Sequence, residues 1–397
     1  MAIEWLKEFG IGVLWLFAQP MFYLAILFTF WTGYIRVKNE RSMFRHRVFP
    51  IGAEWTGTWV TSVVFGVLLS AAMILTGSML SLQWLWLLTV VVALLLLINQ
   101  VWLLSPVYTL GIVAITMWLI NTFNVQLPDW LSSLSNINLV LVSYVLMFLL
   151  IVEIILFATA KRNQSFPELQ KSKRGKFVGS HLVKRLCVIP AFVPVPSGAL
   201  ELSLFTWWPA FGLSDQFGLV LFPFVIGVSQ RFKGNFSDIG ARKVARALSV
   251  LLVLLLIGSY GIYVFPELSI YLVLAAILGR LAIHYVSYVL DREQSPIFIP
   301  KEDGIVIVGV MPNSPAEEME LVVGEKIERI HDEPISNEQE FYEVMSEHRT
   351  FCKMAVQDLS GEVRFVQRAL YEGEYHELGL IFVKEMPKFT LRTEEIS

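Results

Sequence analysis

The chain has 397 residues, of which 55% are hydrophobic and only 16% are charged, and its mean hydropathy is +0.60. A soluble domain carries about a quarter charged residues, so the composition excludes an ordinary soluble protein and places much of the chain in lipid. Residues 1–290 hold 20 basic and 11 acidic residues, whereas residues 291–397 hold 11 and 23. This acidic C-terminal part argues against nucleic acid as a partner.

Apolar runs of about 18 residues or more are long enough to cross the hydrocarbon core of a membrane as helices. The predicted segments are about 10–34, 58–80, 82–99, 101–122, 138–160, 187–208, 211–229, 248–265 and 268–290. Pro20 interrupts the first segment. The sixth contains Pro190, Pro194 and Pro196, so it is also compatible with a broken or re-entrant segment. The sequence therefore predicts a polytopic α-helical membrane domain of eight or nine segments over residues 1–290.

The basic residues of the connecting loops predict the orientation of this domain. The loops 36–47, 161–185 and 231–246 carry five, eight and five Lys and Arg residues. Even numbers of segments separate these loops from one another and from the acidic tail, so all of them are expected in the cytoplasm. The N-terminus, which lacks the features of a secretory signal peptide, is expected outside if the first segment spans and inside if it is re-entrant.

Five ionisable residues lie in or near the apolar segments, where charges are costly and are functional candidates by default. They are Glu153, Glu201, Asp215, Arg280 and His284. Arg280 and His284 share one helix face and could form a relay or a substrate site with Glu153 or Glu201. The alternative is an interhelical ion pair or snorkelling to an interface. We prefer this structural alternative, because the charges are few and nothing suggests paired inverted halves.

Two other features of the sequence limit the possible partners. The basic run Lys171–Lys176, with Lys184 and Arg185, could bind anionic lipid headgroups or an acidic protein, or could set the topology alone. Cys187 and Cys352 lie in different parts of the chain, so no disulfide framework is possible within the tail and a reducing compartment is permitted.

The acidic C-terminal part has the pattern of a small domain of strands and helices. A linker at 291–300 precedes a domain at 301–385, and residues 386–397 form a tail. The expected elements are a strand at 304–310, a turn and helix start at 312–316, a strand at 324–330, a helix from 337 to 348, two strands at 351–359 and 362–370 joined by a hairpin turn, and a last strand at 378–383.

The stretch GIVIVGVMPNSPAEEMELVVGEKIERI, from Gly304 to Ile330, resembles the PDZ family, with Glu325 in place of the usual aspartate and Glu320 in place of the usual glycine. Leu378–Val383 is similar to the groove-edge strand of that family. Its place at the end of the domain resembles the circularly permuted bacterial arrangement. The resemblance implies a small α+β domain in which a peptide adds to this strand against helix 337–348.

The residues expected to form this peptide-binding groove are Glu377, Leu378, Gly379, Leu380, Ile381, Phe382, Phe341, Tyr342 and Met345. A carboxylate at Glu377 would repel a peptide C-terminus, so the groove is expected to take an internal peptide or to be degraded. Binding of a free C-terminus stays open as a further alternative. The alternative is that residues 378–383 form an ordinary core strand.

No catalytic or metal-binding motif accompanies these features. His376-Glu377 lacks the second histidine of an HExxH motif, because position 380 is Leu380. The nucleophile loop of trypsin-like PDZ proteases is also missing, and an intramembrane protease is not supported. The sequence therefore predicts a protein that is not an enzyme and that has no metal and no cofactor.

A polytopic N-terminal part followed by one PDZ-like domain that begins GIVIVGV and ends HELGLIFV resembles the MinJ family, the membrane adaptors of the Min cell-division system. This resemblance implies a bridge between the polar scaffold DivIVA and the ATPase MinD, which carries the inhibitor MinC and so restricts FtsZ assembly. It also implies a multi-pass protein at the septum and cell poles, with contacts to lipid, to other divisome proteins and between its own copies. The alternative is a transporter or channel with a regulatory PDZ domain.

Overall fold

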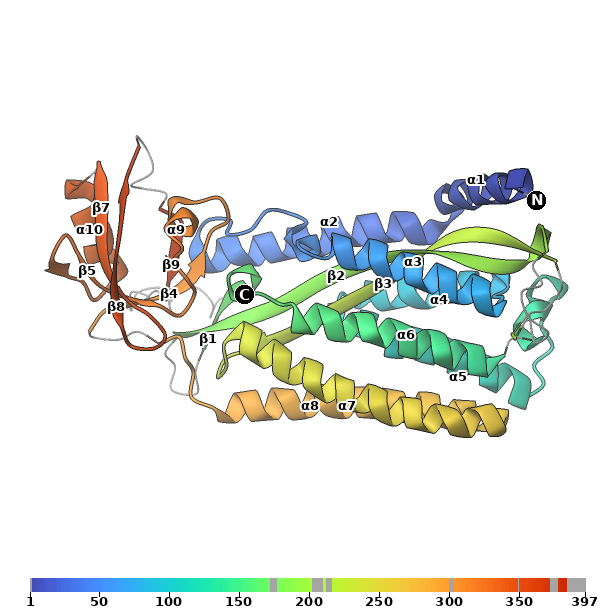
Figure 1. Ribbon diagram of the computed structural model, residues 1–397. Helices are drawn as coiled ribbons and strands as arrows, with labels where there is room; N and C mark the ends of the chain where they lie inside the picture. Colours follow the sequence, from blue (N-terminus) through green and yellow to red (C-terminus); the bar gives the residue numbers. More distant parts are fainter. Residues whose placement is uncertain are drawn as a thin grey trace, which may run out of the picture.

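The structure is an elongated helical bundle with a small domain of strands at one end (Figure 1). This computed structural model describes residues 2–136, 138–171, 177–201, 210–211, 216–299, 303–348, 350–371 and 378–383. The helices are α1 (Ala2–Ala18), α2 (Pro20–Phe44), α3 (Trp59–Thr76), α4 (Leu82–Leu97), α5 (Pro106–Thr122), α6 (Leu139–Ala158), α7 (Ser237–Val264), α8 (Ser269–Glu293), α9 (Pro315–Glu318) and α10 (Glu338–Glu347). The strands are β1 (Phe166–Lys171), β2 (Phe177–Glu201), β3 (Gln216–Phe232), β4 (Ile305–Val310), β5 (Lys326–Ile330), β6 (Glu333–Pro334), β7 (Phe351–Gln357), β8 (Val363–Ala369) and β9 (Leu380–Phe382).

The helical part has the length and composition of a membrane domain. Among the described residues, α3, α6, α7 and the stretch Pro266–Glu293 that includes α8 are long and apolar enough to cross a membrane. The pair α1 and α2 is bent by 49° and counts as a fifth candidate if it forms one span. Pro20 explains this bend, because proline is accommodated at the start of α2 and not within a continuous helix. The predicted polytopic membrane protein with a C-terminal domain of strands and helices is confirmed.

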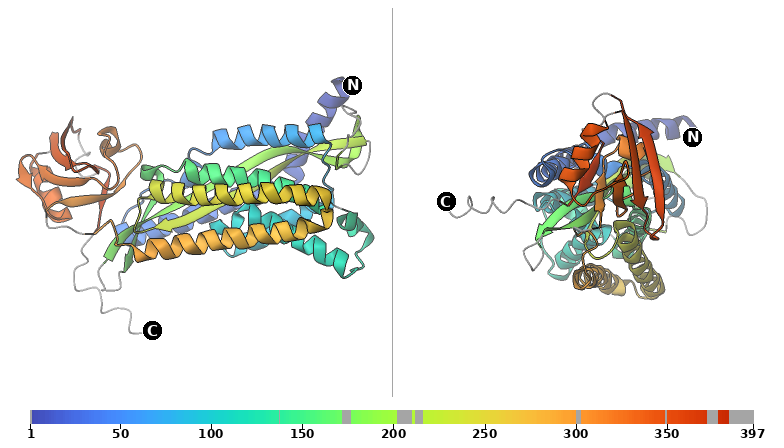
Figure 2. Two further views of the ribbon diagram at one scale, coloured as in Figure 1. Left: turned by 60° about the horizontal axis from the view of Figure 1, so that its bottom comes forward. Right: turned by 90° about the vertical axis from the view of Figure 1, so that its left-hand side faces the viewer.

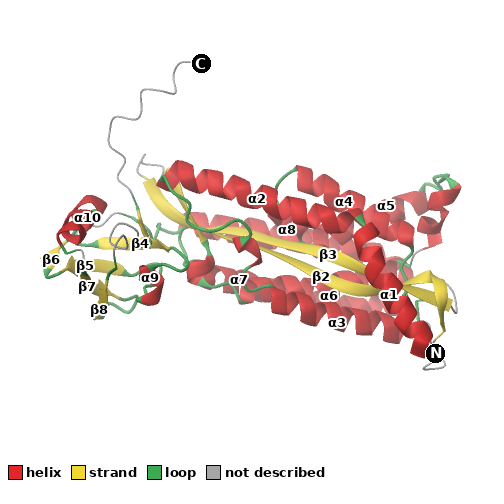
Figure 3. Ribbon diagram, turned by 90° about the horizontal axis from the view of Figure 1, so that it is seen from above, coloured by secondary structure: helices red, strands yellow, loops and turns green. Residues whose placement is uncertain are grey.

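The predicted helices at 187–208 and 211–229 are wrong over their described residues. These segments belong to β2 and β3, which pair as one long antiparallel hairpin. The hairpin runs along the middle of the bundle, between the helices (Figure 3). Window hydropathy detects a run of apolar residues but not the backbone conformation of that run. A strand crosses a given thickness of hydrocarbon with fewer residues than a helix, so an apolar run of this length fits either conformation.

Prolines explain why these segments avoid the helical conformation. Pro190, Pro194 and Pro196 lie in β2, and Pro190 lies directly opposite Pro223 of β3. A proline in a helix interior removes a backbone hydrogen bond and costs about 3 kcal/mol or more. In an antiparallel pair, alternate residues direct their backbone groups outward. The even-numbered spacing therefore places the missing donors of β2 on the outer edge of the hairpin.

Two outward backbone groups of this edge have partners on α3 and on the segment between α3 and α4. The amide of Phe192 donates to Ser70 Oγ of α3 at 2.8 Å, and the carbonyl of Pro194 accepts from the amide of Leu80 at 3.0 Å. A Cβ atom at Gly66 of α3 would lie 2.4 Å from the carbonyl oxygen of Pro190, so only glycine permits this approach. Backbone within the hydrocarbon must be satisfied by protein, and the described contacts meet this requirement for part of β2.

The predicted gathering of the three basic loops is seen at one end of the bundle. Arg231 pairs with Glu168 at 2.6 Å and Arg162 pairs with Asp238 at 2.8 Å, which joins the second loop to the third. Lys184 lies 3.8 Å from Glu54, which also binds the first loop through Arg36. This end carries the C-terminal domain, whereas the N-terminus lies at the other end (Figure 1). The hairpin of β2 and β3 replaces the two predicted helices between the second and third basic loops, so the number of membrane crossings between these loops stays even.

The C-terminal domain has a sheet of order β8-β7-β5-β4-β9, with β6 paired to β5. The last strand, β9, returns to pair with the first strand, β4, as a permuted PDZ-like domain requires. Both departures from the PDZ pattern have a structural counterpart. Glu325 accepts from the amide of Val322 and pairs with Arg364, each at 2.9 Å. Glu320 has φ +56°, in the left-handed region that favours glycine.

Specific contacts seat this PDZ-like domain on the membrane domain. Asn163 donates to the carbonyl of Leu321 and accepts from the amide of Val323, both at 3.1 Å. The amide of Gly179 in β2 donates to the carbonyl of Phe298 at 2.9 Å. The Phe298 side chain is fully buried, with the ring of His181 at 4.7 Å. Two further views show the domain at the end of the bundle (Figure 2).

The buried His181 at this junction predicts that the stability of the folded protein depends on pH. Burial lowers the pKa of His181 from 6.5 to about 4. Above pH 6.5 the imidazole is neutral in both states. Between pH 6.5 and 4 the unfolded chain binds the proton and the folded chain does not, so stability falls as the pH falls. At pH 5 the loss should be about 2 kcal/mol.

Thermal unfolding of the purified protein at pH 7.5 and pH 5 measures this loss. The Nδ1 atom of His181 lies 2.8 Å from Ser165 Oγ. His181→Gln keeps a neutral polar group beside this hydroxyl and should show a smaller difference in stability between the two pH values. An unchanged difference in His181→Gln would assign the pH dependence to other groups.

Arg280 of α8 and Glu153 of α6 form an ion pair inside the membrane domain. Arg280 Nε lies 2.8 Å from Glu153 Oε1, and both side chains are fully buried. Ser105 Oγ donates to the second carboxylate oxygen at 2.5 Å. Each charge alone would be strongly destabilising at this depth. The pair therefore fixes α6 against α8, the helix that leads to the PDZ-like domain.

Replacing one member of the Arg280–Glu153 ion pair should lower the free energy of unfolding more than replacing both members. Arg280→Met or Glu153→Leu alone should destabilise the protein by about 3–5 kcal/mol, because each leaves a buried charge without its partner. The double variant should be about as stable as the wild type. Thermal unfolding in detergent measures the cycle, and single variants as stable as the double variant would contradict the buried pair.

Candidate peptide-binding groove

The predicted groove strand begins with a turn that only glycine can form. Gly379 has φ +84°, and a Cβ atom there would lie 2.2 Å from Ser314 Cβ. The carbonyls of Leu378 and Gly379 accept from the amides of Ala316 and Met311, at 3.0 and 2.8 Å. These bonds attach the turn to the start of α9, so β9 enters the sheet in a fixed position.

The structure brings the predicted strand and the predicted helix together. The rings of Phe382 in β9 and Phe341 in α10 are 5.0 Å apart. Tyr342 packs on Phe341, with ring centroids 5.3 Å apart. Met345 is fully buried in the same core. β9 is the last strand in the order of its sheet, so an added peptide strand would lie beside it and against α10.

Most of the predicted groove side chains are core residues of the domain. Leu378, Leu380, Phe382, Phe341 and Met345 are all buried, at 3% exposure or less. Their apolar character follows from core packing and needs no ligand. Glu377 lies outside the described residues.

Among the groove residues that the structure describes, Tyr342 alone is partly buried, so its side chain is available to a peptide. Burial raises the pKa of Tyr342, with a further contribution from Glu338, so its hydroxyl stays protonated at neutral pH.

Ile381 was expected in the groove but points to the opposite face of β9. It packs in a cluster with Phe44 at the end of α2, with Phe49 in the loop after that helix, and with Phe166 of β1. Sequence analysis missed this contact between the two domains. A signal was present, because the run Leu380-Ile381-Phe382 is apolar on both faces, and such a strand is typically covered on both sides.

The ionisable residues of the membrane domain do not all converge. Arg280 and Glu153 pair as described, and His284 stacks on Trp102 with ring centroids 4.8 Å apart. Glu201 lies toward the hairpin tip and accepts from Gln216 at 2.6 Å, and Asp215 lies outside the described residues. Within the described ranges, no group of three His, Cys, Asp or Glu side chains could hold a metal ion. The arrangement is the interhelical ion pair that the sequence favoured, and Glu201 does not join it to form a relay.

Comparison with known proteins identifies the family. The chain is 30% identical over 394 residues to the cell division topological determinant MinJ of Bacillus subtilis (strain 168), which covers 97% of each chain. It is also 32% identical over 84 residues to the probable cell division topological determinant MinJ of Lacticaseibacillus paracasei, which covers 21% of this chain and 23% of that relative. No family model and no solved structure gives a significant match. Since the similarity to the Bacillus subtilis protein extends over almost the whole of both chains, this chain belongs to the MinJ family.

Proposed function

We propose that this chain is a non-enzymatic membrane adaptor for division-site selection, which bridges a DivIVA-type polar scaffold to MinD and, through MinD, to MinC. Such a bridge restricts FtsZ assembly at poles and completed septa. Membership of a family of cell division topological determinants supports the role in cell division. The observation that carries the adaptor role is a PDZ-like domain held by specific contacts on a membrane-spanning bundle.

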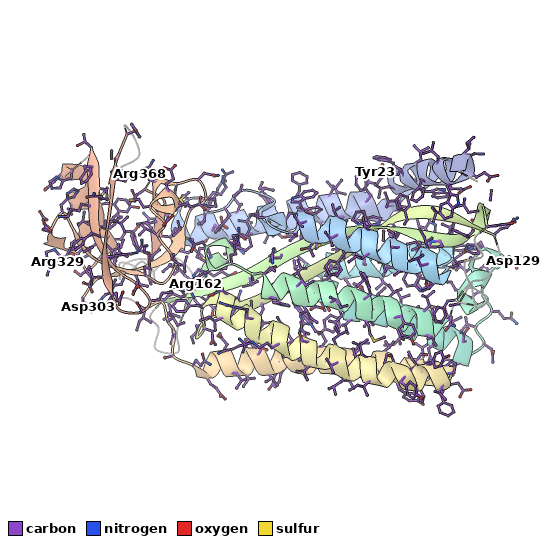
Figure 4. The ribbon with its side chains drawn as sticks, in the orientation of Figure 1. Tyr23, Asp129, Arg162, Asp303, Arg329 and Arg368 are labelled. Atoms are coloured by element: carbon purple, nitrogen blue, oxygen red, sulfur yellow. The ribbon has the colours of Figure 1, made fainter. Side chains whose placement is uncertain are left out.

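The charge distribution supports a cytoplasmic position for the PDZ-like domain. The three basic loops lie at the end of the bundle that carries it, and basic loops favour the cytoplasmic side. Arg162 lies at this end and Asp129 at the opposite end (Figure 4). We therefore place the partners in the cytoplasm and the N-terminus outside. Enrichment at the septum and the cell poles follows from the proposed partners.

The edge of β9 and the exposed part of α10 form the proposed partner site. Backbone groups of an edge strand give affinity to an extended peptide without restricting its sequence, and side chains beside the strand give specificity. Tyr342 is the side chain best placed for this second task, because it lies on α10 and is only partly buried. Other divisome proteins and a second copy of the chain could use the same edge.

A variant of Tyr342 tests this site in the full-length protein. Tyr342→Ala should reduce crosslinking to at least one of DivIVA and MinD in native membranes, on the order of tenfold, because a truncated aromatic side chain at a binding site costs about 1–2 kcal/mol. Glu343→Ala changes the neighbouring exposed residue and serves as the matched control.

Removal of residues 294–397 should leave membrane insertion intact and abolish at least one of these contacts. If the shortened chain still recruited both partners, the loops of the membrane domain would carry the binding and the groove proposal would fail.

A further inference from the structure

A small pocket opens beside the junction, at the end of the membrane domain that carries the basic loops. The concavity encloses about 290 Å³ when its open mouth is included, and only about 10 Å³ of it is accessible to the centre of a water molecule, so a larger ligand would sit at the mouth. Its wall is formed by the stretch before α3, by the residues that follow α6 and by the part of β2 nearest the PDZ-like domain. Its polar lining residues include Thr56, Lys161, Gln164, Lys184 and Arg185.

The residues that line this pocket carry more positive than negative charge. Arg185 is buried at 8% exposure, and its guanidinium donates to the carbonyl of Leu156 at 2.7 Å, to Thr159 Oγ1 at 2.8 Å and to the carbonyl of Gly57 at 3.1 Å. All three acceptors are neutral, and the described residues give Arg185 no carboxylate partner. A buried cation without an anion is costly, so this arrangement favours an anion that the described residues do not supply.

The lysines of the pocket add to this excess. The carboxylate nearest to Lys184 is Glu54, at 3.8 Å, and Glu54 is held more closely by Arg36 at 2.9 Å. Lys161 is exposed, and among the described residues it forms no ion pair. Two ammonium groups and one guanidinium therefore line a pocket whose described lining residues include no carboxylate.

The pocket lies at the depth where lipid headgroups are expected. Trp55 and Trp59, with ring centroids 5.5 Å apart, mark the start of α3, and Trp59 is 63% exposed. Tryptophans of this kind are enriched at the membrane–water interface. Val60 and Val63 continue as an exposed apolar face of α3. An acyl chain lying on that face would place its phosphate close to Lys161 and Lys184.

We propose that the mouth of this pocket binds the phosphate-bearing headgroup of an anionic phospholipid. Lys161 and Lys184 contact the phosphate, Gln164 and Thr56 offer hydrogen bonds, and Arg185 supplies positive potential from below. The segment 161–165 lines the pocket and also carries Asn163, which holds the PDZ-like domain. The bound lipid therefore supports the segment on which the PDZ-like domain is seated.

Native mass spectrometry of the full-length protein in detergent tests the site. Phosphatidylglycerol and phosphatidylcholine are added separately, and inorganic phosphate is added as a third arm. The wild type should retain one phosphatidylglycerol molecule that phosphatidylcholine does not replace. Lys161→Gln with Lys184→Gln should weaken this retention about thirtyfold, since each basic residue at an anionic surface contributes about a fivefold gain in affinity. Lys161→Gln alone changes an exposed residue, so it tests the site even if the double variant fails to fold.

The matched control is Lys38→Gln with Arg41→Gln, which removes the same charge from exposed positions at the end of α2. This control should retain phosphatidylglycerol as the wild type does. Equal loss in both double variants would indicate general surface attraction and would overturn the pocket. Displacement of phosphatidylglycerol by equimolar inorganic phosphate would show a site for free phosphate and would overturn the lipid assignment, as would unchanged retention in Lys161→Gln.

Discussion

The fold depends on how the backbone of a long hairpin is satisfied inside a membrane domain. A strand edge exposed to hydrocarbon leaves amides and carbonyls without partners, at a cost of several kcal/mol for each group. In β2, prolines at alternate positions remove outward donors, and the amide of Phe192 is held by Ser70. The helices that cover the hairpin therefore solve a hydrogen-bonding problem as well as burying apolar side chains. Gly66 allows α3 to approach closely enough to do so.

The same hairpin connects the membrane domain to the PDZ-like domain. At its outer end β2 pairs with β1, and Gly179 donates to Phe298 just before the PDZ-like domain begins. The ion pair of Glu153 and Arg280 fixes α8, which enters that domain from the other side. Two covalently distant elements thus position one small domain, which leaves it less freedom than a flexible linker of similar length would allow.

Much of the architecture could be predicted from the sequence, because it depends on local patterns. Apolar length identified the membrane helices, basic loops identified the end with the PDZ-like domain, and the PDZ resemblance placed the last strand beside helix 337–348. The hairpin was missed because hydropathy windows respond to apolar length and not to backbone conformation. The proline spacing carried that information. The pairing of Glu153 with Arg280 spans 127 positions and depends on how α6 packs against α8, which no local pattern encodes.

The position of Ile381 has a consequence for how a partner would act on this protein. One face of β9 packs on α10, next to the strand edge at which a peptide would add. The other face packs on Phe44 and Phe166 of the membrane domain. A strand held on both faces cannot shift toward a ligand without loosening one of these contacts. Peptide capture at its edge therefore gains from a strand that is already ordered. A force that a bound partner exerts on β9 would be transmitted by the Ile381 contacts to β1 and α2, which belong to the membrane domain.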